Sequence, residues 1–418
     1  MKYNLAFKYR IYPNKEQELL INKTFGCVRF VYNTILYTAN KFYEETGKNK
    51  IITPASLKSE NKFLKEVDSL ALSNAQLNVK RSFTNLFQKR AKFPRFKSKK
   101  NNVKSYTTNC VNNSIRIEEN KYLILPKLKR IKLKYHREIP TNYRLKSVTL
   151  INSNGNYYVS ILTEFEKEIQ KKPSNDKVIG LDFSMSELFV SSENQRADYP
   201  RYFRMLEEEL KKLQKSLSRK VNFSKNWYKQ KEKISKLHEY IKNCRRDFLL
   251  KLSKKLSETY NAVVVEDLNM KGMSQALNFG KSVGDNGWGM FLRMLEYKLM
   301  FLGKQFLKIN KWFPSSKTCS KCGNIKEKLK LSERSYKCEC CGIEIDRDYN
   351  AALKYKKHWK RDFEILGNKK TGQGLSEELG KYIWLAKADT SQEAPAPESG
   401  SSSHNMWYHK IKRIKIKI

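Results

Sequence analysis

Two pairs of cysteines constrain the fold of this chain more than any other feature of its sequence. Cys319 and Cys322 are separated by two residues, Cys338 and Cys341 repeat that gap, and fifteen residues lie between the pairs. Four thiolates on two such loops suit one tetrahedral Zn2+ with sulfur ligands at about 2.3 Å. A glycine follows the second cysteine of each pair, which favours the tight turn that such a loop needs. The spacing therefore predicts a structural zinc ribbon at residues 315–343, in preference to unrelated buried thiols.

One further cysteine leaves a second choice of ligand open. Cys340 lies directly before Cys341, but only Cys338 and Cys341 reproduce the gap of the first pair. The other three cysteines, at positions 27, 110 and 244, stand alone and are expected in the core. The N-terminus is charged throughout and lacks the apolar core of a signal peptide. Together with the clustered cysteines, this favours a protein of the reducing cytoplasm.

The charge balance points to a polyanionic partner. Among 418 residues, 84 Lys and Arg stand against 42 Asp and Glu, which leaves a net charge of +42. A compact chain with so much uncompensated charge repels itself, so the balance argues against an ordinary enzyme of small molecules and indicates nucleic acid. With 39% hydrophobic residues, 17 Gly and 10 Pro, the composition excludes collagen-like, low-complexity and wholly disordered chains. No run of about 18 apolar residues is present, so no membrane partner is expected.

Hydrophobic periodicity predicts strands and helices in alternation along the chain. In the first part these are a strand at 1–12, helices at 16–65 and 70–90, and a hairpin at 146–166. In the second part they are buried strands at 178–184 and 262–268, helices at 199–260 and 288–307, and a helix from about Asp346. Breaks are expected near Gly47 and Pro54, and Asn154-Gly155 is a typical hairpin turn. From residue 371 the composition becomes that of a flexible tail, which ends in nine residues with five cations.

Three acids stand at the ends of predicted elements in the second part. Asp182 closes one buried strand, Glu266 closes the other, and Asp348 begins the helix after the cysteines. If the two strands are neighbours, these acids converge, because α/β folds build sites at strand ends. Converged carboxylates suit two Mg2+ about 3.5–4 Å apart, which assist phosphodiester cleavage.

Other interpretations of the acids are open on pattern alone. Asp182 and Glu266 could merely end strands at a solvent edge, and Asp346 and Asp348 could cap a helix. Asp267 and Asp346 also compete as ligands, because each lies one or two residues from a chosen acid.

Several segments, in order along the chain, resemble the TnpB family, the insertion-sequence-encoded RNA-guided nucleases related to type V CRISPR effectors. They are YRIYPNKEQ (9–17), FGCVRFVYN (25–33), FPRFKS (93–98), LPKLKRIKL (125–133), VIGLDFSMSELFV (178–190), VVVEDLNMKGM (263–273), SSKTCSKCG (315–323) and IDRDYNAA (345–352). The resemblance covers about residues 5–365, and the order and joint presence of the motifs make it specific.

The resemblance implies a multidomain α/β protein. Its RNase H-like RuvC nuclease domain would carry a zinc ribbon, and an N-terminal β-barrel wedge domain would be split by a helical recognition lobe. The implied boundaries are wedge 1–15 and 105–172, recognition lobe 16–104, RuvC domain 173–314 and 344–370, zinc ribbon 315–343, and tail 371–418.

By the same resemblance, the catalytic acids are Asp182, Glu266 and Asp348, which would bind two Mg2+. Asp346 becomes the second choice for the third acid. Two departures are visible: Leu250 stands where many relatives have His, and the tail from residue 371 fits only loosely.

Two basic segments are candidate nucleic-acid contacts. Residues 89–104 hold eight cations and no acid, and residues 121–137 hold seven cations and no acid. The expected contacts are Gln76, Lys80, Lys92, Phe93, Arg95, Phe96, Lys97, Lys129, Arg130 and Lys132. The first two of these are helical residues added by resemblance, as readers of a motif beside the target. The cations would neutralise phosphates and the phenylalanines would stack on bases. The alternatives are a hydrophobic anchor for the loop and a solvated polar helix face.

The leading hypothesis is an RNA-guided DNA endonuclease. It would take a noncoding guide RNA and target double-stranded DNA as partners, and work in a prokaryotic cytoplasm. One alternative is a guided DNA-binding repressor that does not cut. The other is a DNA-joining transposase, although the sequence offers no obvious tyrosine nucleophile with a His-hydrophobe-His metal motif.

Overall fold

The computed structural model describes residues 2–100, 103–170, 176–275, 280–310, 313, 316–329 and 333–369. The chain forms two compact units, which are considered separately. Unit 1 comprises Met1–Gln170 and Leu206–Asn243, and unit 2 comprises Lys171–Met205 and Cys244–Ile418. The tail expected from residue 371 lies outside the described residues.

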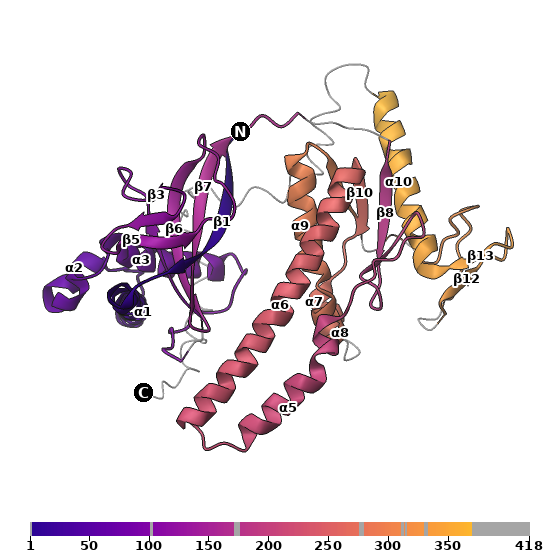
Figure 1. The fold of residues 1–418 in the computed structure, drawn as a ribbon. Helices are drawn as coiled ribbons and strands as arrows, with labels where there is room; N and C mark the ends of the chain where they lie inside the picture. Colours follow the sequence, from indigo (N-terminus) through magenta and orange to yellow (C-terminus); the bar gives the residue numbers. More distant parts are fainter. Residues whose placement is uncertain are drawn as a thin grey trace. The chain divides into compact units, whose positions relative to one another are not determined.

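Unit 1 is built on an antiparallel sheet of seven strands in the order β2-β6-β7-β1-β5-β4-β3 (Figure 1). The strands are β1 (Lys2–Tyr12), β2 (Val103–Asn109), β3 (Arg116–Glu118), β4 (Tyr122–Leu125), β5 (Lys129–Lys134), β6 (Arg144–Ser153) and β7 (Asn156–Glu166). β6 and β7 form the predicted hairpin, and Asn154 and Gly155 have φ values of 51° and 80°, which the turn requires.

Helices α1 (Lys15–Thr46), α2 (Pro54–Glu60) and α3 (Ser69–Phe87), with a short 3-10 helix at Lys62–Lys65, lie between β1 and β2 in the chain. Asn14 and Gln17 form a capping box at the start of α1, and Gly47 ends it with a φ of 68°. The predicted breaks near Gly47 and Pro54 are confirmed. Buried residues of α1, α3 and the sheet share one hydrophobic core, in which Phe25 packs edge-on against Tyr106.

A helical hairpin completes unit 1. Helix α5 (Glu207–Ser218) is followed by α6 (Lys225–Thr259), whose residues beyond Asn243 belong to unit 2. The buried Gln230 donates to the backbone oxygen of Leu213 at 3.0 Å, so the two helices run side by side at this level (Figure 1). The helical content predicted for 199–260 is confirmed, with the short α4 (Tyr202–Met205) at its start.

Unit 2 contains a four-stranded sheet in the order β11-β10-β8-β9. Its strands are β8 (Val178–Phe183), β9 (Phe189–Ser191), β10 (Ala262–Glu266) and β11 (Gln305–Ile309). The remaining elements are α7 (Met270–Gln275), α8 (Gly280–Asn286), α9 (Trp288–Phe301), β12 (Ser335–Lys337), β13 (Glu344–Asp346) and α10 (Arg347–Lys369). β10 pairs in parallel with both β8 and β11, as expected for strands buried on both faces.

The helix predicted over 288–307 is too long. α9 ends at Phe301, Gly303 takes a φ of 70°, and residues 305–307 belong to strand β11. Periodicity alone does not separate a short apolar strand from the last turns of a helix. These residues form a strand because Gln305–Ile309 pairs in parallel with Ala262–Glu266 of β10.

Helix α10 covers β8 and β10 within unit 2 (Figure 1). Ala351, Tyr355 and Trp359 lie on the covered face, packed with Val178 and Val264. At Gly180 the approach is so close that a Cβ atom would stand 2.1 Å from the backbone oxygen of Ala352. No helix among the described residues has the length and apolar character that crossing a membrane requires.

Candidate functional site

Asp182 and Glu266 lie side by side at the ends of two paired strands. Leu181 of β8 is opposite Val265 of β10, so the next residues along the two parallel strands are the two acids. In-register residues of neighbouring strands point to the same face of a sheet. The pairing confirms that these two strands are neighbours, and it places Asp182 and Glu266 at the same edge of the sheet.

Tyr355 of α10 connects the two acids. Its hydroxyl lies 2.9 Å from Oδ1 of Asp182 and 2.7 Å from Oε2 of Glu266, and its ring is fully buried. A hydroxyl has one proton, so it donates a hydrogen bond to only one of the two carboxylates. The short contact to the other acid is favourable when that acid is protonated and donates to the hydroxyl oxygen. Sequence analysis did not single out Tyr355. The available signal was its spacing of seven residues from Asp348, which places both on one face of a helix.

Asp348 lies in the first turn of α10, within electrostatic range of Asp182. Burial, and then the negative charges of Asp348 and Glu266, raise the pKa of Asp182 well above its ordinary value, although the Tyr355 hydrogen bond opposes this. Burial and the neighbouring Asp346 raise the pKa of Asp348 in the same direction. The three acids therefore form one group that disfavours its own full ionisation.

The competing acids have other partners. Asp346 accepts a hydrogen bond from the backbone N–H of Tyr349 at 2.9 Å, which caps α10, and it pairs with Arg196 at 3.1 Å. Asp267 is exposed and lies 4.0 Å from Lys308. The capping interpretation thus applies to Asp346, and Asp348 is left as the acid of this turn whose charge raises the pKa of Asp182.

The four cysteines come together at one point. The sulfur atoms of Cys319 and Cys341 are 3.7 Å apart, and those of Cys322 and Cys338 are 3.5 Å apart. Four ligands about 2.3 Å from a tetrahedral Zn2+ would be about 3.8 Å from each other, so the donor set fits this ion. Among the described residues, these four are the one group of three or more potential ligands found close enough together to hold a metal. The three acids are less closely gathered.

Matching turns present these cysteines. Gly323 donates its N–H to the oxygen of Cys319, and Gly342 donates to that of Cys338, each at 3.1 Å. Both glycines have a positive φ, 81° and 68°, so the Cys-Gly steps have the role that the sequence predicts. Hydrogen bonds from the backbone N–H groups of Cys341 and Cys340 lower the pKa of the Cys338 thiol to about 6, which favours the thiolate that binds metal. The side chain of Cys340 is exposed, outside the group of four.

A second face of α10 holds the first cysteine turn. Asn350 is fully buried, accepts from the N–H of Ser320 and donates to the oxygen of Thr318, both at 2.9 Å. Lys354 donates to the same Thr318 oxygen at 3.1 Å, and Lys357 donates to that of Ser320. Burial lowers the pKa of Lys354 to about 7. One helix thus contacts both the acids and the cysteine module, a link that sequence analysis missed.

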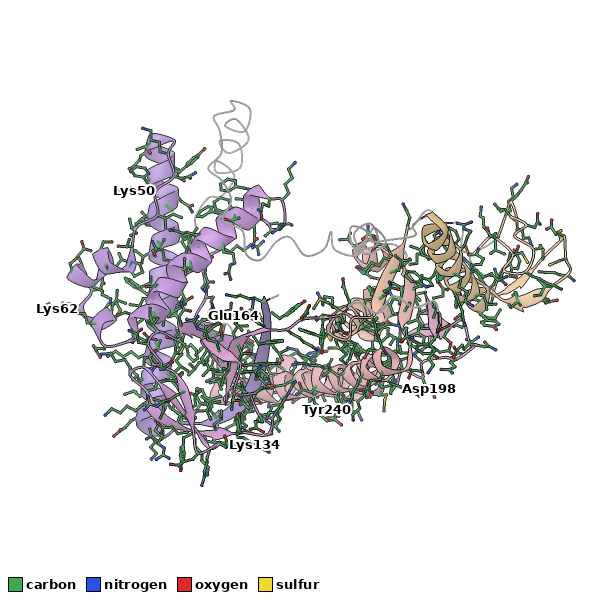
Figure 2. The ribbon with its side chains drawn as sticks, turned by 90° about the horizontal axis from the view of Figure 1, so that it is seen from above. Lys50, Lys62, Lys134, Glu164, Asp198 and Tyr240 are labelled. Carbon is green, nitrogen blue, oxygen red and sulfur yellow. The ribbon has the colours of Figure 1, made fainter. Side chains whose placement is uncertain are left out.

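The residues predicted to bind nucleic acid have mixed surroundings in unit 1. Lys80, Lys92, Arg95, Phe96, Lys129 and Lys132 are exposed, as a binding role needs. Three further lysines of this unit, Lys50, Lys62 and Lys134, are exposed too (Figure 2). The predicted cations are therefore part of a larger set of exposed cations on unit 1.

Four predicted contact residues have structural partners. Gln76 donates to the backbone oxygen of Ile52 at 3.0 Å, and Phe93 packs edge-on against Phe83. Lys97 lies over the ring of Tyr32, and Arg130 lies over Tyr122 and pairs with Glu118 and Glu119. For Phe93, the anchoring alternative agrees with this packing.

Three family models match the chain in succession. The model described as "Helix-turn-helix domain" matches residues 1–48, which here form a strand and one helix. The model described as "Probable transposase" matches residues 160–277, and that described as "Cas12f1-like, TNB domain" matches residues 288–355. The last two together include both acid-bearing strands, the cysteine module and the start of α10.

Relatives of similar length match most of the chain. A protein of Streptomyces pristinaespiralis named "Putative RNA-guided DNA endonuclease" is 34% identical over 83% of this chain and 87% of the relative. InsQ of Escherichia coli, with the same description, is 32% identical over 84% of this chain and 91% of the relative. "TnpB-like protein L79" of Acanthamoeba polyphaga mimivirus is 24% identical over 82% and 71%.

A solved structure shares the fold. The protein in the "Cryo-EM structure of the Cas12f1-sgRNA-target DNA complex" superposes with a TM-score of 0.53 at 14% identity, over 85% of this chain and 99% of that one. Such a likeness concerns the architecture alone. With the identity and coverage of the sequence relatives, it leads to one conclusion: the chain belongs to the TnpB family.

Proposed function

We propose that this chain is an RNA-guided DNA endonuclease, which uses a noncoding RNA to recognise double-stranded DNA beside a short motif. The observation that carries the chemistry is the meeting of Asp182 and Glu266 at the hydroxyl of Tyr355, with Asp348 in electrostatic range. The descriptions of the two bacterial relatives support the choice of reaction.

Asp182, Glu266 and Asp348 are the proposed catalytic acids. The raised pKa values of Asp182 and Asp348 mark a group of carboxylates without enough positive charge around it, which two Mg2+ would supply. Bound there, the ions would activate a water and stabilise the leaving oxygen of a phosphodiester. Asp182 and Glu266 would hold their positions through the paired strands, and Asp348 through the first turn of α10.

The domain assignment is part of the proposal. The strands of unit 1 would form the barrel-like wedge at 1–15 and 105–172, and its helices the recognition lobe at 16–104. The RuvC domain would span 173–314 and 344–370, with the zinc ribbon at 315–343. One Zn2+ on Cys319, Cys322, Cys338 and Cys341 would fix the turns that α10 holds, in a cytoplasm that keeps the thiols reduced.

The charge of the chain has a role in guided recognition. Base pairing between guide and target reads the sequence, and the protein holds the backbones. The exposed cations at Lys80, Lys92, Arg95, Lys129 and Lys132 would position nucleic acid without reading bases. Phe96, with 49% of its surface exposed, would remain available for stacking on a base.

The test is to express the gene with its native flanking DNA, purify the protein and sequence the RNA that accompanies it. One dominant structured RNA, with an end that matches flanking DNA, is expected. That RNA then guides a cleavage assay with Mg2+, in which Asp182→Asn, Glu266→Gln and Asp348→Asn each remove cutting and leave RNA binding intact. Asp267→Asn is the matched control, because this neighbouring acid pairs with Lys308 and should be dispensable.

The other functions correspond to distinct outcomes of this test. Guided DNA binding with no cleavage by the unaltered protein would identify a repressor. Covalent joining of DNA ends would identify a transposase, in accordance with the description of one family model. A random mixture of cellular RNA would refute guided recognition.

A further inference from the structure

The connection between α5 and α6 carries apolar side chains that the fold leaves outside. Phe223 is 63% exposed and Tyr228 is 54% exposed, while Val221 nearby is 79% exposed. Trp227 lies between them in sequence and is half-buried. Single exposed apolar residues are common, but a group within eight residues at one end of a helical hairpin indicates a contact surface. We call Phe223, Trp227 and Tyr228 the aromatic tip.

The aromatic tip is held in a defined arrangement. The ring centroids of Phe223 and Trp227 are 5.4 Å apart, and those of Trp227 and Tyr228 are 5.1 Å apart with the rings nearly perpendicular. Ser224 accepts a hydrogen bond from the N–H of Trp227 at 3.1 Å, which starts α6. The rings are therefore positioned before any partner arrives.

Phe223 has an unfavourable backbone conformation. Its φ is 66°, a region that a bulky residue rarely adopts. Burial of the ring does not compensate for this strain, because most of the side chain is exposed. Strained residues that persist at a surface cluster at functional sites, which favours a binding role for this ring.

Cations surround the tip. Residues 219–233 contain six Lys and Arg and one acid, Glu232, which pairs with Lys236 at 2.8 Å. Lys231 Nζ lies 5.0 Å from the ring centroid of Trp227. Lys100, from the basic segment at 89–104, lies 5.6 Å from that of Phe223. Flat exposed rings among cations are complementary to unpaired bases between phosphates, and not to a cationic or purely aliphatic partner.

We propose that the aromatic tip binds an unpaired stretch of the RNA, with a base stacked on Phe223 and the flanking phosphates near Lys100 and Lys231. RNA is preferred over DNA because the proposed function gives the chain a noncoding RNA, which can offer unpaired bases, and a DNA target that is double-stranded. The choice of RNA rests on the proposed function, but the stacking surface itself does not.

The test measures binding of a short unstructured RNA oligonucleotide to the full chain and to Phe223→Leu. Leucine keeps an apolar side chain and removes the aromatic face, so the Kd should rise about tenfold. Phe223→Trp should bind as the unaltered chain does. Leu19→Ala is the matched control, because Leu19 of α1 is 75% exposed outside the tip, and its loss should not change the Kd.

Salt dependence separates stacking from charge. Phe223→Leu removes no cation, so its log Kd against log salt should keep the slope of the unaltered chain, whereas Lys231→Ala should reduce that slope by about one. An unchanged Kd for Phe223→Leu would overturn the proposal. The proposal would also be overturned if Phe223→Leu bound DNA of the same sequence more weakly than the unaltered chain does, but bound RNA equally well. Guided cleavage by the unaltered chain is scored separately, so a failure here is distinct from a failure of the nuclease assignment.

Discussion

Asp182 occupies a position that disfavours its own charge. Burial raises its pKa well above the ordinary value, and two neighbouring carboxylates add to the effect. A carboxyl group whose pKa is higher in the folded chain than in the unfolded chain favours folding at low pH, and this contribution is lost as the pH rises through the folded pKa. Without divalent ions, ionisation of the acid group as the pH rises therefore weakens the fold that contains it.

Asp182→Asn should raise the melting temperature of the metal-free chain at neutral pH while it removes cleavage. A gain of about 1 kcal/mol corresponds to roughly 2–4 °C for a unit of this size. The gain should shrink as the pH is lowered, since the carboxyl group of the unaltered chain then becomes protonated. Thermal unfolding without added Mg2+ at several pH values measures this.

Asp346→Ala provides the contrast for that experiment. Asp346 caps α10 and pairs with Arg196, so its loss should lower stability by about 0.5–2 kcal/mol. If Asp182→Asn destabilises the chain as Asp346→Ala does, the account of a strained acid group is wrong.

Tyr355 should assist ionisation of Asp182. Its hydroxyl stabilises the charged carboxylate, so Tyr355→Phe raises the pKa of Asp182 further. Protons then compete better with a divalent ion, and Mn2+ should bind several-fold more weakly at neutral pH, with affinity recovering at higher pH. Calorimetric titration with Mn2+ at two pH values checks this. A deficit that is equal at both values would mean that Tyr355 acts only through packing.

At the scale of elements, α10 depends on a glycine in the strand beneath it. Gly180→Ala would place a Cβ atom 2.1 Å from the oxygen of Ala352, and both groups belong to backbones that cannot turn aside. The helix must shift, so we expect a loss of about 1–3 kcal/mol in stability and a loss of cleavage. Circular dichroism melting and the guided cleavage assay measure the two effects.

Gly26→Ala is the matched glycine control. Gly26 lies within α1, and nothing stands within 4 Å of the position that its Cβ would take. Alanine favours a helix by roughly 0.5–1 kcal/mol over glycine, so this variant should be more stable. Equal effects of the two substitutions would contradict the close packing of α10 on β8.

The same elements show what could be predicted from sequence. Short apolar strands that end in acids are local patterns, so β8, β10, Asp182 and Glu266 were predictable, and two equal cysteine gaps identified the four thiols that lie together. Tyr355 and Asn350 could not be predicted, because an aromatic or an amide side chain in a helix indicates no role until the packing of that helix is known. The length of α9 and the exposure of Phe223 also depend on packing that the local sequence does not show. α9 ends where it does because the residues after it pair with β10. Phe223 is exposed because it lies where α5 and α6 are joined.

At the scale of the whole molecule, the net charge of +42 acts on stability and on binding in opposite directions. Like charges on a compact chain repel each other, and salt screens this repulsion over about 10 Å at 0.1 M. Salt also weakens binding to RNA, because each counterion released on binding gains less entropy when the surrounding salt is concentrated. Raising NaCl from about 0.05 to 0.5 M should therefore raise the melting temperature of the RNA-free chain, and lower that of the RNA complex toward the same value. Unfolding curves of both forms across this range decide the matter, with a neutral osmolyte as the control for general solvent effects. If salt destabilises the RNA-free chain, local ion pairs outweigh the net charge, and the excess of cations does not oppose folding.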